Sequence, residues 1–321
     1  MNLADPLHHL LVSAIRHQEA DEIDEARDLY VEILEKNPRH EQALHLGGLL
    51  CLQHGEFGGA RTLLETAIDV NPNNPAYSNH LGVVSLREND LDGALELFRR
   101  ATGMDPTYSE AYFNLGIALR GVDDLEGAAE AISRALENDP DNDRILVWAG
   151  VLAHERGDQH AAAELLMRAV ELNPTNAEAL HQLGDIFVAL NSLPDAERCY
   201  RTAIDVNPKV AGFHGKLGSV LTQLHRLDEA HRSFEVALSI NPDDAALLGG
   251  VALVYLEQGE IDKARAHAER ALSIDNDSVD GHYSMAMVHR VTGDLQGARV
   301  EAARVRELAP DNARYLDGLD I

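Results

Sequence analysis

The sixteen histidines are the residues of this sequence with the most obvious capacity for metal binding or catalysis. His40 is followed by Glu41, which is how a zinc-protease motif begins. That motif needs a second histidine four residues after the first, so that both rings lie on one helix face. Leu44 occupies this place, and His45 comes one residue too late. We therefore expect histidines of the surface and of helix packing, and no bound metal.

Other signatures of catalysis are missing from the sequence as well. The glycines before Lys216 lack the spacing of a phosphate-binding loop, and neither a nucleophile elbow nor a CxxC pair occurs. Cys51 and Cys199 are the only cysteines, which is too few for a disulfide framework. Both fit small residues of a helical core. The sequence thus predicts a protein that is not an enzyme and that uses no cofactor.

The chain is strongly acidic, with 54 Asp and Glu against 27 Lys and Arg and a net charge of −27. Nucleic-acid binding needs a basic surface, so we expect no nucleic-acid partner. The acidity favours solubility, and it could also steer basic partners toward the protein. No apolar run is long enough to cross a membrane, and the first residues lack the pattern of a signal peptide. We expect no membrane contact and a cytoplasmic location, although the mature form of an exported protein would look the same.

Proline sets a period of 34 residues along the chain. Proline cannot continue a helix and disfavours helical dihedrals in the residue before it, so each one indicates the end of a helix. Asn276 takes the place of proline in the eighth slot. The series is Pro38, Pro72, Pro106, Pro140, Pro174, Pro208, Pro242 and Pro310.

Small residues recur in phase with the prolines. Alanine stands twelve residues before each period mark in all nine slots, from Ala26 to Ala298. Glycine or alanine stands another twelve residues earlier. These series indicate two helices whose backbones approach closely, since larger residues would overpack the crossing. Glycine or asparagine between the helices, as at Gly55 and Asn89, tolerates the left-handed backbone of a helix end.

The pattern resembles the tetratricopeptide repeat, whose marks are an aromatic residue, Leu-Gly, Tyr, Ala, Phe and a terminal Pro at fixed offsets. The central unit carries the resemblance in Tyr112-Phe113-Asn114-Leu115-Gly116, Ala128, Ile132, Ala135 and Pro140. The resemblance implies an all-α fold, a right-handed α-solenoid of nine helix-turn-helix repeats. We expect one superhelix over residues 1-321, with repeats 7-40, 41-74, 75-108, 109-142, 143-176, 177-210, 211-244, 245-278 and 279-312 and a short terminal helix at 313-321.

The resemblance also implies that the first helix of each repeat lines a concave wall. One position of this wall forms an apolar ladder of Leu49, Val83, Ile117 and Val151, flanked by polar side chains. Such a wall suits an extended peptide or an amphipathic helix. Alternatively, the ladder packs against the neighbouring repeat and never meets a ligand. The predicted peptide-binding residues are His45, Leu49, Asn79, Val83, Arg87, Phe113, Asn114, Ile117, Arg120, Val151, His154 and His181.

These observations predict a non-enzymatic scaffold that binds a protein or peptide partner in the groove. Two alternatives stay open: a module that recruits substrates for a separately encoded transferase, and homotypic assembly through the ends of the array. The first repeats resemble those of bacterial proteins that fuse such repeats to a transferase. Of the asparagine ladder that grips substrate in the glycosyltransferase members, only Asn114 is matched, and the sequence after Pro310 holds no transferase domain.

Overall fold

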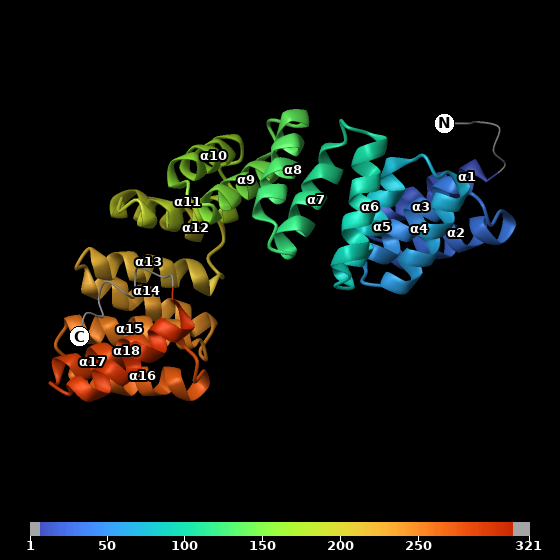
Figure 1. The fold of residues 1–321 in the computed structure, drawn as a ribbon. Helices are drawn as coiled ribbons and strands as arrows, with labels where there is room; N and C mark the ends of the chain where they lie inside the picture. Colours follow the sequence, from blue (N-terminus) through green and yellow to red (C-terminus); the bar gives the residue numbers. More distant parts are fainter. Residues whose placement is uncertain (1–6, 311–321) are drawn as a thin grey trace. The chain divides into compact units, whose positions relative to one another are not determined.

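The computed structural model describes residues 7–310, which form eighteen α-helices joined by short turns (Figure 1). The terminal helix predicted at 313–321 lies outside the described residues. The helices are α1 (His8–Glu19), α2 (Ile23–Lys36), α3 (Glu41–Gln53), α4 (Phe57–Val70), α5 (Pro75–Arg87), α6 (Leu91–Met104), α7 (Ser109–Gly121), α8 (Leu125–Asn138), α9 (Asp143–Glu155), α10 (Gln159–Leu172), α11 (Ala177–Ala189), α12 (Leu193–Val206), α13 (Ala211–Gln223), α14 (Leu227–Ile240), α15 (Ala245–Glu257), α16 (Ile261–Ile274), α17 (Val279–Val291) and α18 (Leu295–Leu308).

Each predicted repeat contains one pair of these helices. From the second repeat to the ninth, the first helix begins at the predicted first residue, at Glu41 in the second and at Val279 in the ninth. Polar caps explain several of these starts. The side-chain oxygen of Asn176, for example, accepts a hydrogen bond from the backbone N–H of Ala179 at 2.9 Å. Such a bond satisfies one of the free N–H groups at a helix N-terminus, so the cap fixes where the helix begins.

A residue with a left-handed backbone ends the first helix of every repeat. The predicted glycines and asparagines adopt this conformation, with φ of 76° at Gly55 and 63° at Asn89. Aspartate and histidine take the same place in three repeats, which the sequence analysis did not foresee. The full series is Asp21, Gly55, Asn89, Asp123, Gly157, Asn191, His225, Gly259 and Gly293.

The small residues are buried, but the reason differs from the expected approach of two bare backbones. The alanine series from Ala26 to Ala298 is fully buried, as predicted. At Gly82, however, a Cβ would lie 2.6 Å from the ring of Phe98 in the second helix. The glycine thus makes room for a large side chain, because a methyl group there would overpack the pair. In the eighth repeat, Ala252 is paired with the small Ala268.

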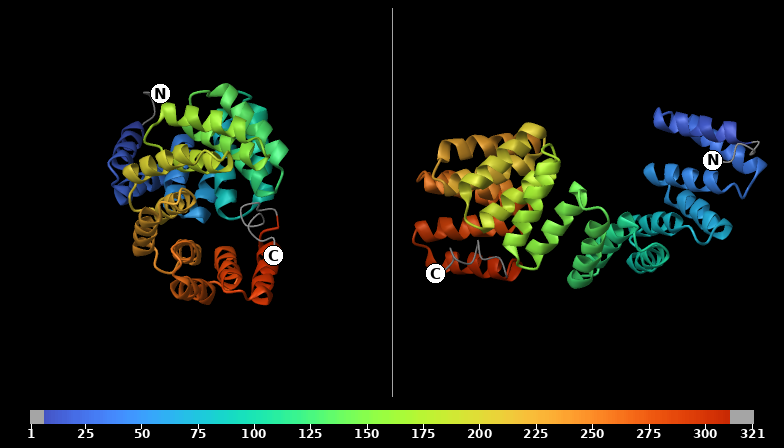
Figure 2. Two further views of the ribbon diagram at one scale, coloured as in Figure 1. Left: turned by 90° about the vertical axis from the view of Figure 1, so that its left-hand side faces the viewer. Right: turned by 90° about the horizontal axis from the view of Figure 1, so that it is seen from above.

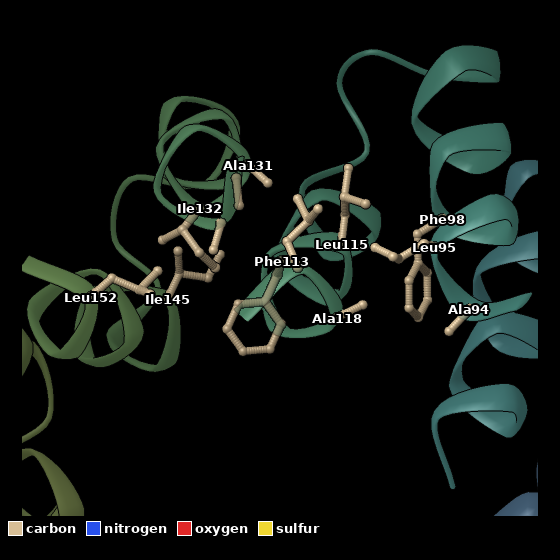
Figure 3. Close-up of a cluster of buried hydrophobic side chains, with 13 residues drawn as sticks. Ala94, Leu95, Phe98, Phe113, Leu115, Ala118, Ala131, Ile132, Ile145 and Leu152 are labelled. Carbon is tan, nitrogen blue, oxygen red and sulfur yellow. The ribbon is translucent and has the colours of Figure 1, made fainter. Parts of the chain in front are cut away.

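Helix packing divides the chain into two compact units, α1–α9 and α10–α18, which join in sequence at Arg156 and Gly157. The boundary falls inside the fifth repeat, so α9 belongs to the first unit and α10 to the second. In the other eight repeats the two helices of a pair pack against each other, and within each unit successive pairs pack together, as two further views show (Figure 2). One buried cluster of the first unit draws side chains from α6, α7, α8 and α9, among them Phe98, Leu115, Ile132 and Ile145 (Figure 3). Neighbouring repeats therefore share a continuous core, which is what a stacked array requires.

Candidate functional site

The apolar ladder lies at one position of the first helices α3, α5, α7 and α9, all in the first unit. Leu49, Val83, Ile117 and Val151 are each half-buried. Val83 and Ile117 pack on one side against the buried cluster around Phe98. The ladder therefore takes part in packing between repeats and also keeps apolar surface that a partner could reach.

Asn79 and Asn114 lie inside the packing of the first helices rather than on their accessible surface. Asn79 is fully buried and donates a hydrogen bond to the Tyr108 hydroxyl at 3.3 Å. Asn114 donates to the side-chain oxygen of Asn79 at 2.9 Å. Burial raises the pKa of Tyr108 to about 12, so its hydroxyl keeps its proton at neutral pH. The two amide side chains therefore join α5 to α7 from buried positions and are not part of the accessible surface of the wall.

Aromatic rings and arginines interlock on α7 and α9. Phe113 is buried, and its ring meets the edge of Trp148 with the ring centroids 6.1 Å apart. The Arg144 guanidinium lies 4.4 Å from the centroid of Phe113, and the Arg120 guanidinium lies 5.6 Å from that of Trp148. Both are cation–π distances. Trp148 is half-buried, so part of its side chain packs against the buried cluster and part remains accessible.

Arg120 is held by a two-point ion pair. Its Nε donates to both carboxylate oxygens of Glu155, at 2.9 and 3.0 Å, and Nη2 donates to one of them as well. Such a fork fixes the guanidinium plane beside the tryptophan. Arg87 is exposed at the end of α5, and His154 is half-buried on α9.

His45 of α3 and His80 of α5 form a hydrogen-bonded pair, with Nε2 and Nδ1 2.8 Å apart. Burial lowers the pKa of both rings to about 4, and for His45 the neighbouring ring of His80 adds to this effect. One ring can donate to the other only while at least one of them is neutral. At neutral pH, His45 is therefore an uncharged part of the wall.

His181 lies on α11 in the second unit and has its own surroundings. Its ring is 5.3 Å from that of Phe213, and its Nε2 is 3.8 Å from the carboxylate of Asp185. Asp185 also accepts a hydrogen bond from Tyr200 at 2.5 Å and pairs with Lys216 at 2.9 Å. The position that carries the apolar ladder in the first unit is thus charged and paired here.

The structure shows which contacts the sequence analysis missed. His80, Tyr108, Arg144 and Glu155 all contact predicted wall residues. Three hydrogen-bonded pairs, and the Phe113–Trp148 ring pair, join residues 35 apart in sequence, one more than the period. Because this separation links successive first helices, it is a signal by which His80 and Glu155 could have been found.

The described residues offer little other chemistry. Among residues 7–310, no three His, Cys, Asp or Glu side chains gather as they would around a metal ion. Within the same range, no helix has the length and apolar character needed to cross a bilayer.

Comparison with protein families finds the tetratricopeptide repeat along most of the chain. Three repeat models match residues 45–109 and 181–245, residues 85–150, 221–270 and 257–319, and residues 143–176. None of these models describes a catalytic domain. No curated protein matches the chain.

Several solved structures share the fold. The APC/C hetero-tetramer Cut9-Hcn1 matches with a TM-score of 0.64 and 19% identity, over 84% of this chain and 52% of that one, so this chain spans about half its length. A tetratricopeptide repeat protein from Parabacteroides merdae matches with a TM-score of 0.65 and 20% identity, over 76% of this chain and 96% of that one. The C-terminal part of a repeat-containing protein from Cytophaga hutchinsonii matches with a TM-score of 0.52 and 16% identity, over 75% of this chain and 98% of that one.

At these identities the likeness shows the fold alone, and it agrees with the helix pairs described above. The all-α solenoid of nine helix-turn-helix repeats is thereby confirmed. No transferase domain is evident among residues 7–310. The chain belongs to the tetratricopeptide repeat family, whose members serve in general as protein-interaction scaffolds.

Proposed function

We propose that the first helices α3, α5, α7 and α9 bind an extended peptide or an amphipathic helix of a partner protein, so that the protein acts as a non-enzymatic scaffold. The observation that carries this proposal is Trp148, half-buried between the Phe113 ring and the Arg120 guanidinium. Tryptophan and arginine are the residues that most often dominate binding energy at interfaces. Here the ion pair with Glu155 already fixes the arginine, so little side-chain entropy remains to be lost on binding.

The other wall residues would act in two ways. Leu49, Val83, Ile117 and Val151 would supply apolar contact, because each keeps part of its side chain accessible. The exposed or half-buried polar side chains of the first unit would form the rim of the site; they are His45, Arg87 and His154. His181 belongs to the second unit and would contact a partner there, within its own surroundings. The buried Asn79, Phe113 and Asn114 would position these residues without touching the partner themselves.

A photo-crosslinking residue tests this placement directly. We would introduce it at Ile117 on the wall and, as a control, at Val31, an apolar side chain on the second helix α2 that is 50% exposed. The proposal predicts a crosslinked partner from position 117 that is absent from position 31. It also predicts that Trp148→Ala weakens binding of the crosslinked peptide by about 2–4 kcal/mol in calorimetry. Crosslinking from position 31 alone, or full affinity after Trp148→Ala, would contradict it.

The identity of the crosslinked partner separates the two uses of such a wall. A transferase or its substrate would indicate a recruiting module, and any other protein would indicate a scaffold of a different complex. We further propose a cytoplasmic setting, which fractionation of cells that carry a tagged chain would test.

Self-association is a second candidate function, favoured by one observation. The three most exposed large apolar side chains among the described residues all belong to the ninth repeat: Val291 at 57%, Leu295 at 53% and Val300 at 63%. Leu295 stands where earlier repeats bury a similar residue more deeply. Light scattering at low and moderate salt tests this candidate, since a net charge of −27 opposes association most strongly at low salt. A monomer under both conditions removes it.

A further inference from the structure

An arginine recurs at one place of the second helices, the twenty-sixth residue of the repeat. Arg100 in the third repeat donates a hydrogen bond to the backbone oxygen of Pro72 in the second, at 3.1 Å. Arg270 in the eighth repeat does the same to Pro242 at 3.0 Å. Arg304 in the ninth reaches Asp277 of the preceding repeat. At these three junctions the arginine joins the second helix of one repeat to the turn that follows the second helix of the repeat before it.

Four repeats lack the arginine: the first has Glu32, the second Thr66 and the sixth Thr202 at this place, and the seventh has a valine. Val236 is 42% exposed, and the backbone oxygen that corresponds to those above belongs to Pro208. Beside Val236 a pocket of about 330 Å³ opens between α12 and α14, over α13. Its apolar lining includes Ile204, Leu217 and Leu221. The place that an arginine takes at the three junctions above is thus held here by a valine beside an open pocket.

The polar groups of the pocket suit a guanidinium group. Asp205 and Glu229 line it as carboxylates. Glu229 already accepts two hydrogen bonds from Arg226, each at 2.7 Å, so Asp205 is the carboxylate that would bind a guest side chain. Pro208 itself is not among the lining residues, but its oxygen lies 2.9 Å from Nε2 of the lining residue His214. Because a carbonyl oxygen has two lone pairs, it can accept a second hydrogen bond. Two cations also line the pocket. Arg201 is already paired with Glu229 and Glu197, at 3.2 and 2.8 Å, while Arg232 is exposed.

We propose that this pocket takes an arginine side chain from a basic segment of a partner protein, in the place that the chain's own arginine fills at other junctions. The apolar lining would cover the aliphatic stem, and the acceptors at the rim would bind the head. The net charge of −27 would favour the approach of such a segment. The site uses α12, α13 and α14, none of which belongs to the peptide-binding wall proposed above.

A binding assay with matched probes tests the proposal. A short fluorescein-labelled peptide of arginine alternating with glycine would be titrated with the protein, and anisotropy would be measured. A second peptide would carry citrulline, which has nearly the same shape as arginine but no charge. We expect the arginine peptide to bind and the citrulline peptide to bind at least about tenfold more weakly, because hydrogen bonds to charged groups are the stronger ones. Equal affinities would overturn the proposal.

Three variants locate the binding. Val236→Arg places an arginine of the chain itself in the pocket and should weaken peptide binding by about tenfold or more. Ile274→Arg is the control, because it adds the same charge at a side chain of similar exposure, 40%. It should leave the affinity close to that of the wild type. Arg232→Gln should strengthen binding, because it removes a like charge from the rim. Equal effects of the two arginine substitutions, or weaker binding by Arg232→Gln, would refute the proposal.

Thermal unfolding gives a second, independent measurement. If the groove matches the arginine-filled junctions, Val236→Arg should unfold at the same temperature as the wild type or higher, since the new side chain finds the Pro208 oxygen that its counterparts use. A clearly lower unfolding temperature would show that the groove does not accommodate an arginine and would overturn the proposal by itself.

Discussion

Acidification should weaken the junction between the second and third repeats, because two half-buried histidines face each other there. His45 and His80 share one hydrogen bond of 2.8 Å, and their rings are stacked with centroids 4.9 Å apart. The ring of Tyr77 lies 4.8 Å from His45. Glu41, the nearby anion, accepts hydrogen bonds from Tyr77 and from the Asn71 amide, each at 2.7 Å. Its charge raises the pKa of His45, but burial and the second ring outweigh it.

The direction in which stability changes with pH follows from the pKa of His80 in the folded and in the unfolded chain. Burial lowers the pKa of His80 from 6.5 to about 4, while in the unfolded chain the ring takes up a proton near 6.5. The stability that the neutral His80 contributes is therefore fully present above pH 6.5. It falls as the pH drops below this value, and this contribution is lost completely below the folded pKa of about 4. When the pH falls from about 7 to about 5, protonation linked to His80 alone should lower the free energy of unfolding by roughly 2 kcal/mol. The half-buried His45 should add about 1 kcal/mol, since solvent screens part of its interaction.

The matched variant is His80→Asn, because asparagine stands at the corresponding place of the next repeat, Asn114. Urea unfolding followed by circular dichroism would be measured for both proteins at the two pH values. The wild type should lose about 2–3 kcal/mol more than the variant on acidification. His225→Asn is the control, since it makes the same substitution at a side chain that is 80% exposed and lies outside the histidine pair. Equal pH dependence of the wild type and His80→Asn would refute the reasoning, and hydrogen exchange would show whether α3 and α5 open first.

Three further predictions concern stability and reactivity. Gly82→Ala should lower the free energy of unfolding in urea by about 1–3 kcal/mol, because the new Cβ would lie 2.6 Å from the Phe98 ring. Adding Phe98→Leu should recover part of this loss, and a double variant in which the two losses simply add would contradict the reasoning. Asn89 has a φ of 63°, which alanine adopts less readily than glycine. Asn89→Ala should therefore lower the free energy of unfolding by about 1 kcal/mol and Asn89→Gly by much less, so equal losses would argue against backbone strain. Burial raises the pKa of the Cys199 thiol to about 11, so a thiol reagent at mildly alkaline pH should modify it only after unfolding, and rapid labelling of the folded protein would disprove this.

Several features of the fold follow from local sequence and were predicted correctly. The prolines mark the ends of the repeats, and the predicted first residues of the second to ninth repeats coincide with helix starts. The turn conformation at Gly55 and Asn89 was also foreseen. These features depend on a few neighbouring residues, because proline, glycine and capping side chains act on the backbone beside them.

The candidate site was harder to predict. Asn79, Phe113 and Asn114 read from sequence as surface residues of the wall, yet all three are buried. Their exposure depends on the next repeat, which contributes partners such as Asn114 for Asn79 and Trp148 for Phe113. A single helix period cannot show how closely the neighbouring helix approaches or which side chains it covers.

The sequence by itself thus determined the repeat, most of its turns and its family, because each rests on residues that act locally and recur with a fixed period. Only the tertiary structure decided which wall residues stay accessible, that His45 meets His80, and that a pocket opens at Val236. The physical reason is the same in each case: burial, pKa and open volume depend on side chains from adjacent repeats, and their contacts exist only once the repeats have stacked.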